Sequence, residues 1–427
     1  MRKSCYLLIT AIILLSVQSC RNSERKVSSI INNPESSPIS NDEDSPDNNI
    51  FTIDYRNIKD TVSLQITEIL DDIKFIKLET REESLMKIGG LTGFTMESGT
   101  IWIGEKYILV LDRSMGILQF TSEGNFVRTL VSPGRGPCEF GYPVYTVVET
   151  GSGTLYIADP THPKSIMRYN LTTGECLSTI PRALDGFVKS LLVADDSTIL
   201  ITPLPTSGAA GKYFIFSQTF NGRLIWGIKN AGLNLTTDYR MDELSRIRDS
   251  IYFQPIHYDT VFIYDNQKLK PTMIIKSRNK PSPETNYISE GNIKVSIETN
   301  TPFYAIISAQ QIQEVRGNNS GGLNIKSTGI HSVFVDKLNK RAYKISGTKD
   351  EMLNWQFHPG KYRSSSKGDI FYTFTATEFR YMAARIAENA DFVIDSSIKD
   401  QIIQLGKIHT SSDNPVIMIG KPKPFRD

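Results

Sequence analysis

Four stretches of the sequence repeat one pattern of strands and turns at intervals of about 48 residues. Runs of Ile, Val, Tyr, Phe and Thr alternate with Gly, Asn, Asp and Pro, so each stretch reads as a series of short β-strands. One strand of each stretch ends on an aromatic residue; the spacings are 49, 47 and 48 residues, and the residues are Phe120, Tyr169, Phe216 and Tyr264. Turn glycines recur at similar intervals, at Gly124, Gly174 and Gly222. A period of this length makes each unit one small sheet.

A unit with three or four strands cannot bury both faces of its sheet alone. Stacking such units around an axis gives a β-propeller, in which neighbouring sheets cover one another. Residues 330–345 fit a fifth unit, and residues 364–376 fit part of a sixth. The sequence therefore predicts an all-β, six-bladed β-propeller, with a β-sandwich of coincidental spacing as the alternative.

The period changes towards the C-terminus. Apolar side chains recur at helical spacing, which predicts an amphipathic helix within residues 377–406. The side chains concerned are Phe379, Met382, Ala383, Ile386 and Ala387. A second short helix is expected at about residues 398–405. The apolar segments 415–419 and 73–78 are the two candidates for the strand that completes a blade and closes the ring.

Residues 1–19 are expected to be a secretory signal. Arg2 and Lys3 precede an apolar stretch, residues 6–17, which is short for a membrane span. The stretch leads into Ser19 and Cys20, and this junction resembles the bacterial lipobox. The resemblance implies cleavage before Cys20 and a diacylglyceryl group on its sulfur, which gives durable anchoring. An ordinary signal peptide with an incidental cysteine is the alternative.

Residues 20–50 are predicted to be the lipidated cysteine and a flexible tether. The segment is rich in Ser, Asn, Pro and Asp and has little apolar surface to bury. The propeller, with its helices and closing strand, then spans residues 51–427. Without the signal the chain has 46 basic and 46 acidic residues. This neutral balance argues against a nucleic-acid partner.

Four segments resemble the six-bladed β-propeller lipoproteins of Bacteroidota. Residues 73–80 (IKFIKLET) are similar to that family's opening strand, and residues 134–140 (GRGPCEF) to its Gly-x-Gly-Pro-Gly-Glu-aromatic turn after the first blade. Residues 258–264 (YDTVFIY) and 413–423 (DNPVIMIGKPK) resemble its mid-chain and C-terminal signatures. The resemblance implies a fold and a place in the cell envelope but no reaction. Cys138 stands where the family has a second glycine, and a left-handed backbone would be strained there.

The segment 131–140 (VSPGRGPCEF) has three readings: a phosphate-binding loop, the seat of a nucleophile, or a corner of the backbone. It lacks the Lys-Ser/Thr of a P-loop, and no nearby histidine marks Cys138 as a nucleophile. The preferred interpretation is a corner between two blades that needs unusual backbone angles. Its structural residues are Gly134, Gly136, Pro137 and Glu139. Arg135 is the candidate for a second role, because its fixed charge and five donors suit an anionic ligand such as a uronate or a sulfated sugar.

No catalytic constellation is visible in the sequence, and neither a cofactor nor a metal is expected. Gly-x-Ser-x-Gly, His-Glu-x-x-His and Cys-x-x-Cys are missing. The five histidines are far apart in the chain: His162, His257, His331, His358 and His409. In an oxidising compartment Cys138 and Cys176 either pair or remain two buried thiols, and the sequence leaves both open.

Two functions of different classes remain. The first is a non-catalytic binding or interaction lipoprotein of the cell envelope, held at the membrane by its lipid, whose propeller takes a glycan, a peptide or an envelope protein. The alternative is a propeller enzyme, a hydrolase or lyase acting on a glycan. The residues after Cys20 (RNSERK) lack the acidic cluster of a surface-export tag. This favours an outer-membrane lipoprotein that faces the periplasm, with surface exposure as the alternative.

Overall fold

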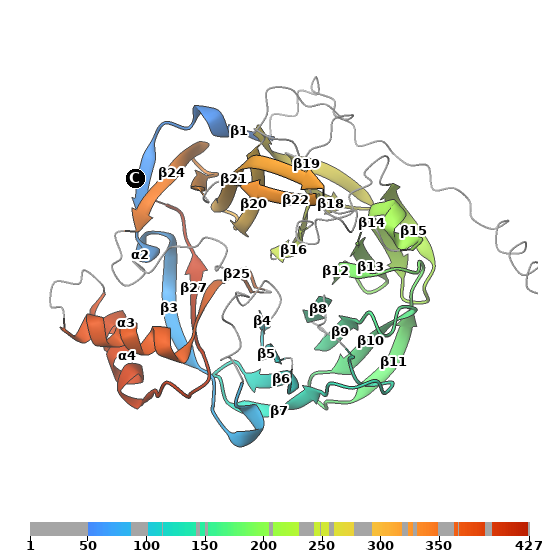
Figure 1. Cartoon of the computed structure of the whole chain (residues 1–427), viewed down its shortest axis with the longest axis horizontal. Helices are drawn as coiled ribbons and strands as arrows, with labels where there is room; N and C mark the ends of the chain where they lie inside the picture. Colours follow the sequence, from blue (N-terminus) through green and yellow to red (C-terminus); the bar gives the residue numbers. More distant parts are fainter. Residues whose placement is uncertain are drawn as a thin grey trace, which may run out of the picture. The chain divides into compact units, whose positions relative to one another are not determined.

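A computed structural model describes most of the chain beyond the tether, within the compact unit Ile39–Asp427. The residues described are 50–86, 101–112, 114–141, 146–149, 153–204, 208–229, 243–247, 249–255, 260–276, 293–317, 323–327, 331–348, 363–365, 367–388 and 395–425. Six β-sheets are arranged around one axis in this unit (Figure 1). The predicted six-bladed β-propeller is confirmed.

Blades 1 to 3 are four-stranded antiparallel sheets whose strands follow one another in chain order from the axis outward (Figure 1). Blade 1 consists of β4 (Ile101–Ile103), β5 (Tyr107–Asp112), β6 (Gly116–Thr121) and β7 (Phe126–Val131). Blade 2 consists of β8 (Thr146–Glu149), β9 (Thr154–Ala158), β10 (Ser165–Asn170) and β11 (Cys176–Pro181). Blade 3 consists of β12 (Val188–Val193), β13 (Thr198–Pro203), β14 (Tyr213–Thr219) and β15 (Leu224–Lys229), with the short helix η4 (Ala210–Lys212) before β14.

Blades 4 and 5 each gain a fifth strand on the outer edge from the N-terminal part of the domain. Blade 4 consists of β16 (Glu243–Ile247), β17 (Ser250–Gln254), β18 (Thr260–Asp265), β19 (Lys268–Lys276) and β1 (Phe51–Asp54). Blade 5 consists of β20 (Ile293–Asn300), β21 (Tyr304–Gly317), β23 (His331–Asp336), β24 (Arg341–Thr348) and β2 (Thr61–Leu64), and β22 (Leu323–Ser327) pairs with the far end of β21.

The two added strands, β1 and β2, were not predicted from the sequence. Each pairs in parallel with the outermost strand of its blade, β1 with β19 and β2 with β24. The short helices η1 (Tyr55–Asn57) and α2 (Ile66–Ile69) follow them. Ile53, Ile58 and Leu64 are buried against the blades. The segment therefore covers two sheet edges that would otherwise expose unpaired backbone groups.

Blade 6 closes the ring with strands from both ends of the domain. It consists of β25 (Arg363–Ser364), β26 (Ile370–Phe374), β27 (Val416–Pro422) and, outermost, β3 (Leu70–Lys77), which is followed by η2 (Glu82–Ser84). Both predicted candidates for the closing strand therefore lie side by side in one sheet. The buried Asn414 reinforces this junction: its side chain accepts from Met86 N at 2.9 Å and donates to Glu79 O at 2.7 Å and Ser84 O at 2.8 Å.

Two helices stand between β26 and β27, as the change of period predicts. They are α3 (Ala376–Glu388) and α4 (Ser396–Ile408). The start of α3 is set by a capping box, since Glu378 N donates to Thr375 Oγ1 and Thr375 N donates to the Glu378 carboxylate. Asp395 caps α4 by accepting from Ser397 N at 2.8 Å. The predicted apolar side chains are buried except Ala387: Phe379, Met382, Ala383 and Ile386.

The core of the described part consists of six apolar clusters, one between each pair of neighbouring blades. The four repeated aromatic residues all lie on third strands and pack against the preceding blade. Three occupy the same register, opposite the second residue of the second strand. Phe216 lies two residues earlier, opposite Ile201, and Gln218 occupies the equivalent place. The regular spacing predicts equivalent positions for all four aromatic residues, and this prediction is wrong for Phe216.

The repeated turn glycines make a second contact between neighbouring blades. Gly124, Gly174 and Gly222 have φ of +91°, +81° and +79°. A Cβ on them would lie 2.3 Å from Lys77 O, 2.4 Å from Arg128 Nη1 and 2.8 Å from Pro181 O, which belong to the outermost strand of the preceding blade. A left-handed backbone and a close neighbour both require glycine here. The period thus records how the blades pack as well as how each one folds.

Candidate functional site

The two ends of the blades differ in how they are connected. Because the first four strands of each blade, counted from the axis, are antiparallel, one end carries the turns between strands one and two and between strands three and four. We name this end the turn face; it includes residues 104–106, 122–125, 171–175, 194–197, 220–223 and 337–340. The other end carries the connections from strand two to strand three and from blade to blade. We name it the connector face; its described residues include 132–141, 159–164, 182–187 and 208–212.

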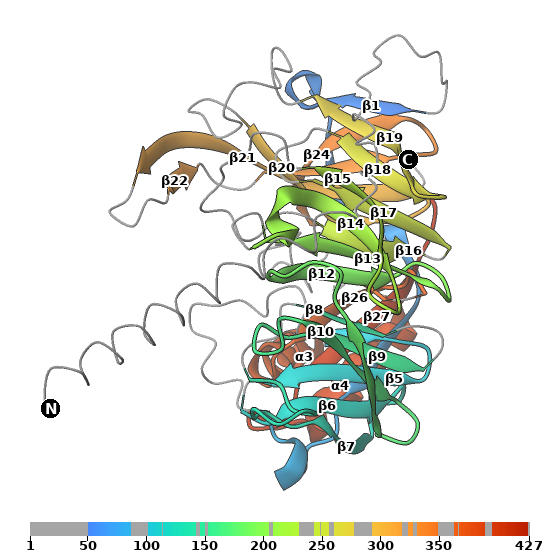
Figure 2. The same cartoon turned by 90° about the vertical axis from the view of Figure 1, so that its right-hand side faces the viewer.

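The connector face carries the elaborations of the fold. In blade 5 the connection from β21 to β23 contains a further hairpin, because β21 runs for 14 residues and pairs with β22 beyond the end of the blade (Figure 2). In blade 6 the corresponding connection contains α3 and α4. The described turns of the turn face are short by comparison. Loops on a rigid scaffold are the usual place for binding residues, so the connector face is the candidate face for a binding site.

The predicted corner, residues 134–140, connects blade 1 to blade 2 on this face. Pro133 pairs with Phe140 in a single bridge, and Gly134 N donates to Phe140 O at 2.8 Å. Gly136 N donates to the Glu139 carboxylate at 2.9 Å. Phe140 is buried in the cluster between the two blades. The segment is therefore a compact turn fastened at both of its ends.

The reason for the glycines differs from the expected one. Neither Gly134 nor Gly136 has a positive φ, and neither does Cys138, so the corner needs no unusual backbone angle. The Glu139 carboxylate instead lies on the glycines: a Cβ would be 1.9 Å from its Oε2 at Gly134 and 3.0 Å at Gly136. The glycines leave room for a side chain of the same loop. Pro137 and Arg135 are exposed.

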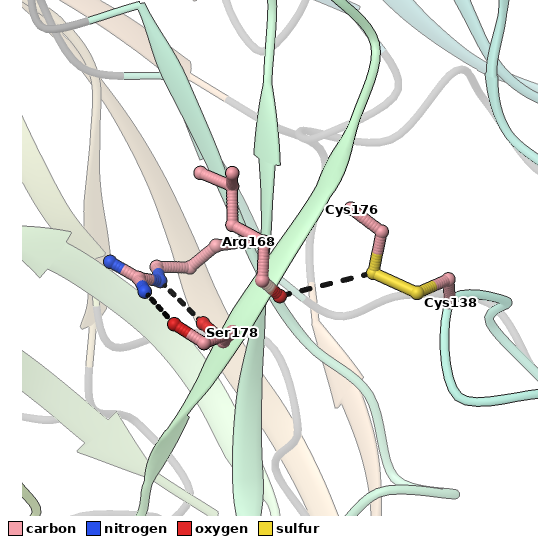
Figure 3. The surroundings of a disulfide bond; sticks show 5 residues. Cys138, Arg168, Cys176 and Ser178 are labelled. Atoms are coloured by element: carbon pink, nitrogen blue, oxygen red, sulfur yellow. Dashed lines mark hydrogen bonds between the residues drawn. A yellow bond between two sulfur atoms is a disulfide. The ribbon is translucent and has the colours of Figure 1, made fainter.

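A disulfide bond joins the corner to blade 2. Cys138 pairs with Cys176, the first residue of the outermost strand β11, with the two Cα atoms 6.0 Å apart (Figure 3). On the neighbouring strand, Arg168 donates to Ser178 O at 2.7 Å and to Ser178 Oγ at 2.6 Å. Of the two alternatives for the cysteines, pairing is correct. Arg135 is held in this cross-linked loop, and its role in ligand binding stays a prediction.

Asp159 anchors the same corner from blade 2. Its buried carboxylate accepts from Gly141 N at 2.8 Å, from Thr161 N at 2.9 Å and from Thr161 Oγ1 at 2.6 Å, and His162 Nδ1 lies 3.4 Å away. These donors tie the incoming connection to the turn between β9 and β10. The arrangement makes Asp159 a structural anchor, because its carboxylate accepts from two backbone N–H groups and one hydroxyl of two different connections.

Tyr169 lies behind this corner with a buried hydroxyl that has no hydrogen-bond partner among the described residues. Burial raises the pKa of Tyr169 to about 12, and the negative charges of Glu139 and Asp159 act in the same direction. The phenol is therefore neutral at physiological pH. Its aromatic body fills the space between blades 1 and 2.

The connection from blade 2 to blade 3 leads directly to the axis. Residues 182–187 join the outermost strand β11 to the innermost strand β12, and Phe187 at their end is 45% exposed. Leu204 N donates to Phe187 O at 2.9 Å, which holds the backbone in place. Arg182 Nη2 donates to Gly186 O, and burial lowers the pKa of Arg182 while the carboxylate of Asp185 raises it.

Residues 182–187 carry no motif that predicts a site. The only signal available was an aromatic residue after a glycine, directly before a strand, and that pattern is common.

A half-buried cation lies on the turn face of blade 5. Lys337 donates to Asn300 Oδ1 and to Thr301 O, and its Nζ is 5.9 Å from the centre of the Tyr252 ring. Burial lowers the pKa of Lys337 to about 8. Because its acceptors belong to the turn between β20 and β21, the lysine joins two turns of one blade. Nothing in the residues around Lys337 predicts these contacts.

The histidines are placed in different blades where they are described. His162 is in blade 2, and His409 is buried at the end of α4, edge-on to the Phe379 ring. Burial lowers the pKa of His409, whereas the neighbouring Asp413 raises it. His257 and His358 lie outside the described residues, as do Cys20 and the tether. Within the described ranges no three His, Cys, Asp or Glu side chains are grouped so that they could hold a metal ion.

No helix among the described residues is both long enough and apolar enough to cross a membrane.

The family model "Domain of unknown function (DUF4934)" matches residues 50–421, which include every blade. The chain belongs to this family. The match begins just before β1, so the two strands that cover the outer edges are part of the DUF4934 domain. None of the curated proteins compared with the chain matches it.

Among solved structures, this DUF4934 chain is similar to a protein of Bacteroides fragilis that is described as exported. The identity is 14% and the TM-score is 0.61, over 88% of this chain and 99% of that one. A weaker likeness, with 11% identity and a TM-score of 0.34, involves the extracellular domain of a hybrid two-component system from B. thetaiotaomicron, over 70% of this chain and 38% of that one. The first likeness supports the shared fold, and the second carries no argument.

Proposed function

We propose that this protein is a cell-envelope lipoprotein, anchored through Cys20, that acts as a non-catalytic binding or interaction module. The observation that carries the proposal is the difference between the two ends of the propeller. The connector face holds the extra hairpin of blade 5, the helices of blade 6 and the fastened corner of blade 2. A rigid ring with elaborated loops on one face is suited to holding a ligand or a partner there.

An extracytoplasmic location agrees with two further observations. Cys138 and Cys176 form a disulfide, and disulfides persist in oxidising compartments. The similar B. fragilis protein is described as exported. The disulfide and the exported relative, together with the signal and the lipobox-like junction at Ser19 and Cys20, favour a lipoprotein of the outer membrane. The RNSERK segment after Cys20 favours its periplasmic side.

Photocrosslinking in cells tests the binding face. A photoreactive phenylalanine analogue is placed at Phe187 on the connector face or, as a control, at Leu338 on the turn face, since both side chains are substantially exposed. We expect adducts, to protein or to polysaccharide, from position 187 and not from position 338. Equal labelling from both positions, or none from position 187, would contradict the proposal.

The anchor is tested separately. Cys20→Ser should move the protein from the membrane fraction to the soluble fraction and abolish incorporation of labelled palmitate. Retention of that variant in membranes would contradict lipidation at Cys20. Protease treatment of intact cells then decides the side: protection is expected for the periplasmic face, and digestion would show surface exposure.

A further inference from the structure

Three side chains of different chemistry stand together on the six-residue connection between blades 2 and 3. Arg182, Asp185 and Phe187 lie on residues 182–187, immediately before the innermost strand β12 begins. The connection leads from the outermost strand of blade 2 to the innermost strand of blade 3, and it ends at the axial side of blade 3 on the connector face (Figure 1).

The backbone of this connection is fixed by the neighbouring connection of blade 3. Ala210 N donates to Asp185 O at 2.9 Å, and Leu204 N donates to Phe187 O at 2.9 Å. Gly208 is packed so closely that a Cβ would lie 2.7 Å from Asp185 O. The three side chains are thus presented from a preorganised backbone, which lowers the entropy lost when a ligand binds.

Two of the three side chains have polar groups without a hydrogen-bond partner among the described residues, and the third is exposed. Arg182 donates through Nη2 to Gly186 O, and its buried Nε has no acceptor among the described residues. The Asp185 carboxylate accepts no hydrogen bond from the described part of the chain, although it lies close enough to Arg182 to raise the pKa of that guanidinium. The Phe187 ring is 45% exposed.

We propose that Arg182, Asp185 and Phe187 form a subsite for a neutral sugar ring. A pyranose has an apolar C–H face, which packs on an aromatic ring, and adjacent hydroxyls, which accept from a guanidinium and donate to a carboxylate. The pairing of opposite charges disfavours a strongly charged ligand, because an anion would meet Asp185 and a cation would meet Arg182. This inference rests on the proposed function and names the ligand class for the connector face.

Binding to immobilised oligosaccharides tests the subsite. The chain from Arg21 onward is applied to an array of neutral hexose and N-acetylhexosamine oligosaccharides, next to uronate-containing and sulfated ones. We expect binding to at least one neutral oligosaccharide. Phe187→Ala should weaken it by about tenfold or more, through loss of the stacked area, and Asp185→Asn by a similar factor. Leu338→Ala, which removes an exposed apolar side chain from the turn face, should leave it unchanged.

The outcomes separate the subsite from the wider proposal. No binding to any neutral oligosaccharide, or equal binding by wild type and both variants with unchanged melting temperatures, overturns the sugar subsite. Binding confined to the uronate or sulfated probes overturns it too and would favour Arg135 as the ligand-binding residue. If the array is negative while photocrosslinking at position 187 still captures a partner, the sugar subsite fails and the binding function stands; if both are negative, both fail.

Discussion

Removing the disulfide between Cys138 and Cys176 should destabilise the propeller by an amount that follows from chain length. The two cysteines are 38 residues apart. Closing a loop of that length removes about 13 cal/mol/K of entropy from the unfolded chain, which is about 3.9 kcal/mol at 25 °C. For a folded domain of this size the entropy of unfolding near the midpoint is about 0.8 kcal/mol/K, so the melting temperature should fall by about 5 °C.

The measurement is differential scanning calorimetry of the chain that starts at Arg21, which contains no other cysteine. The double variant Cys138→Ser, Cys176→Ser is compared with wild type, with and without a reducing agent. We expect reduced wild type to melt at the temperature of the double variant, and the variant to be insensitive to reduction. Identical melting of oxidised and reduced wild type would show that the bond does not form in solution or does not constrain the unfolded chain.

Four further substitutions test the corner, the ring closure and the lysine of the turn face. Gly134→Ala should lower the free energy of unfolding by about 1–3 kcal/mol, and Gly136→Ala by less, because the added Cβ would lie 1.9 Å from the Glu139 Oε2 at position 134 and 3.0 Å from it at position 136. Urea denaturation compares the two variants, and the reverse order would contradict the contact with Glu139 as the reason for the glycines. Asn414→Ala should lower the free energy of unfolding by about 2–4 kcal/mol, because it leaves buried backbone groups unpaired at the ring closure. A variant with the wild-type melting temperature would show that the ring closure does not depend on Asn414. The pKa of Lys337 falls from 10.5 to about 8 on folding, so between these pH values the unfolded chain binds more protons than the folded one. The free energy of unfolding should therefore rise with pH in that window by about 1–3 kcal/mol. Lys337→Met should lack this rise, and equal pH dependence of the unfolding free energy in wild type and variant would refute the shift.

Much of the architecture could be predicted because it rests on local patterns. The spacing of Phe120, Tyr169 and Tyr264 reflects one strand position repeated in blades 1, 2 and 4. Glycines with positive φ mark the turn after the third strand in blades 1 to 3. Phe216 has the expected spacing but lies two residues earlier on its strand than the other three aromatic residues. A shift of two residues keeps the side chain on the same face of the sheet, so the spacing along the chain cannot detect it. The helices near the C-terminus were visible for the same local reason.

The candidate site could be predicted only in part. The corner at residues 134–140 was recognisable from its composition, but the physical reason for its glycines was not, since it depends on where the Glu139 side chain folds back. Arg182, Asp185 and Phe187 were not selected, because nothing in six ordinary residues shows that they lead from the outermost to the innermost strand. Lys337 is likewise unremarkable in sequence, and its low pKa exists only because folding buries it.

The amino-acid sequence by itself determined the repeated unit, the number of blades and the positions of the C-terminal helices, because periodicity and capping act between residues that are near neighbours in the chain. Only the tertiary structure decided that β1 and β2 cover the outer edges of blades 4 and 5 and that Cys138 meets Cys176. It also decided which end of the ring carries the elaborated connections. The physical reason is common to these features: each joins residues far apart in the chain, and their meeting is set by the closed packing of six sheets.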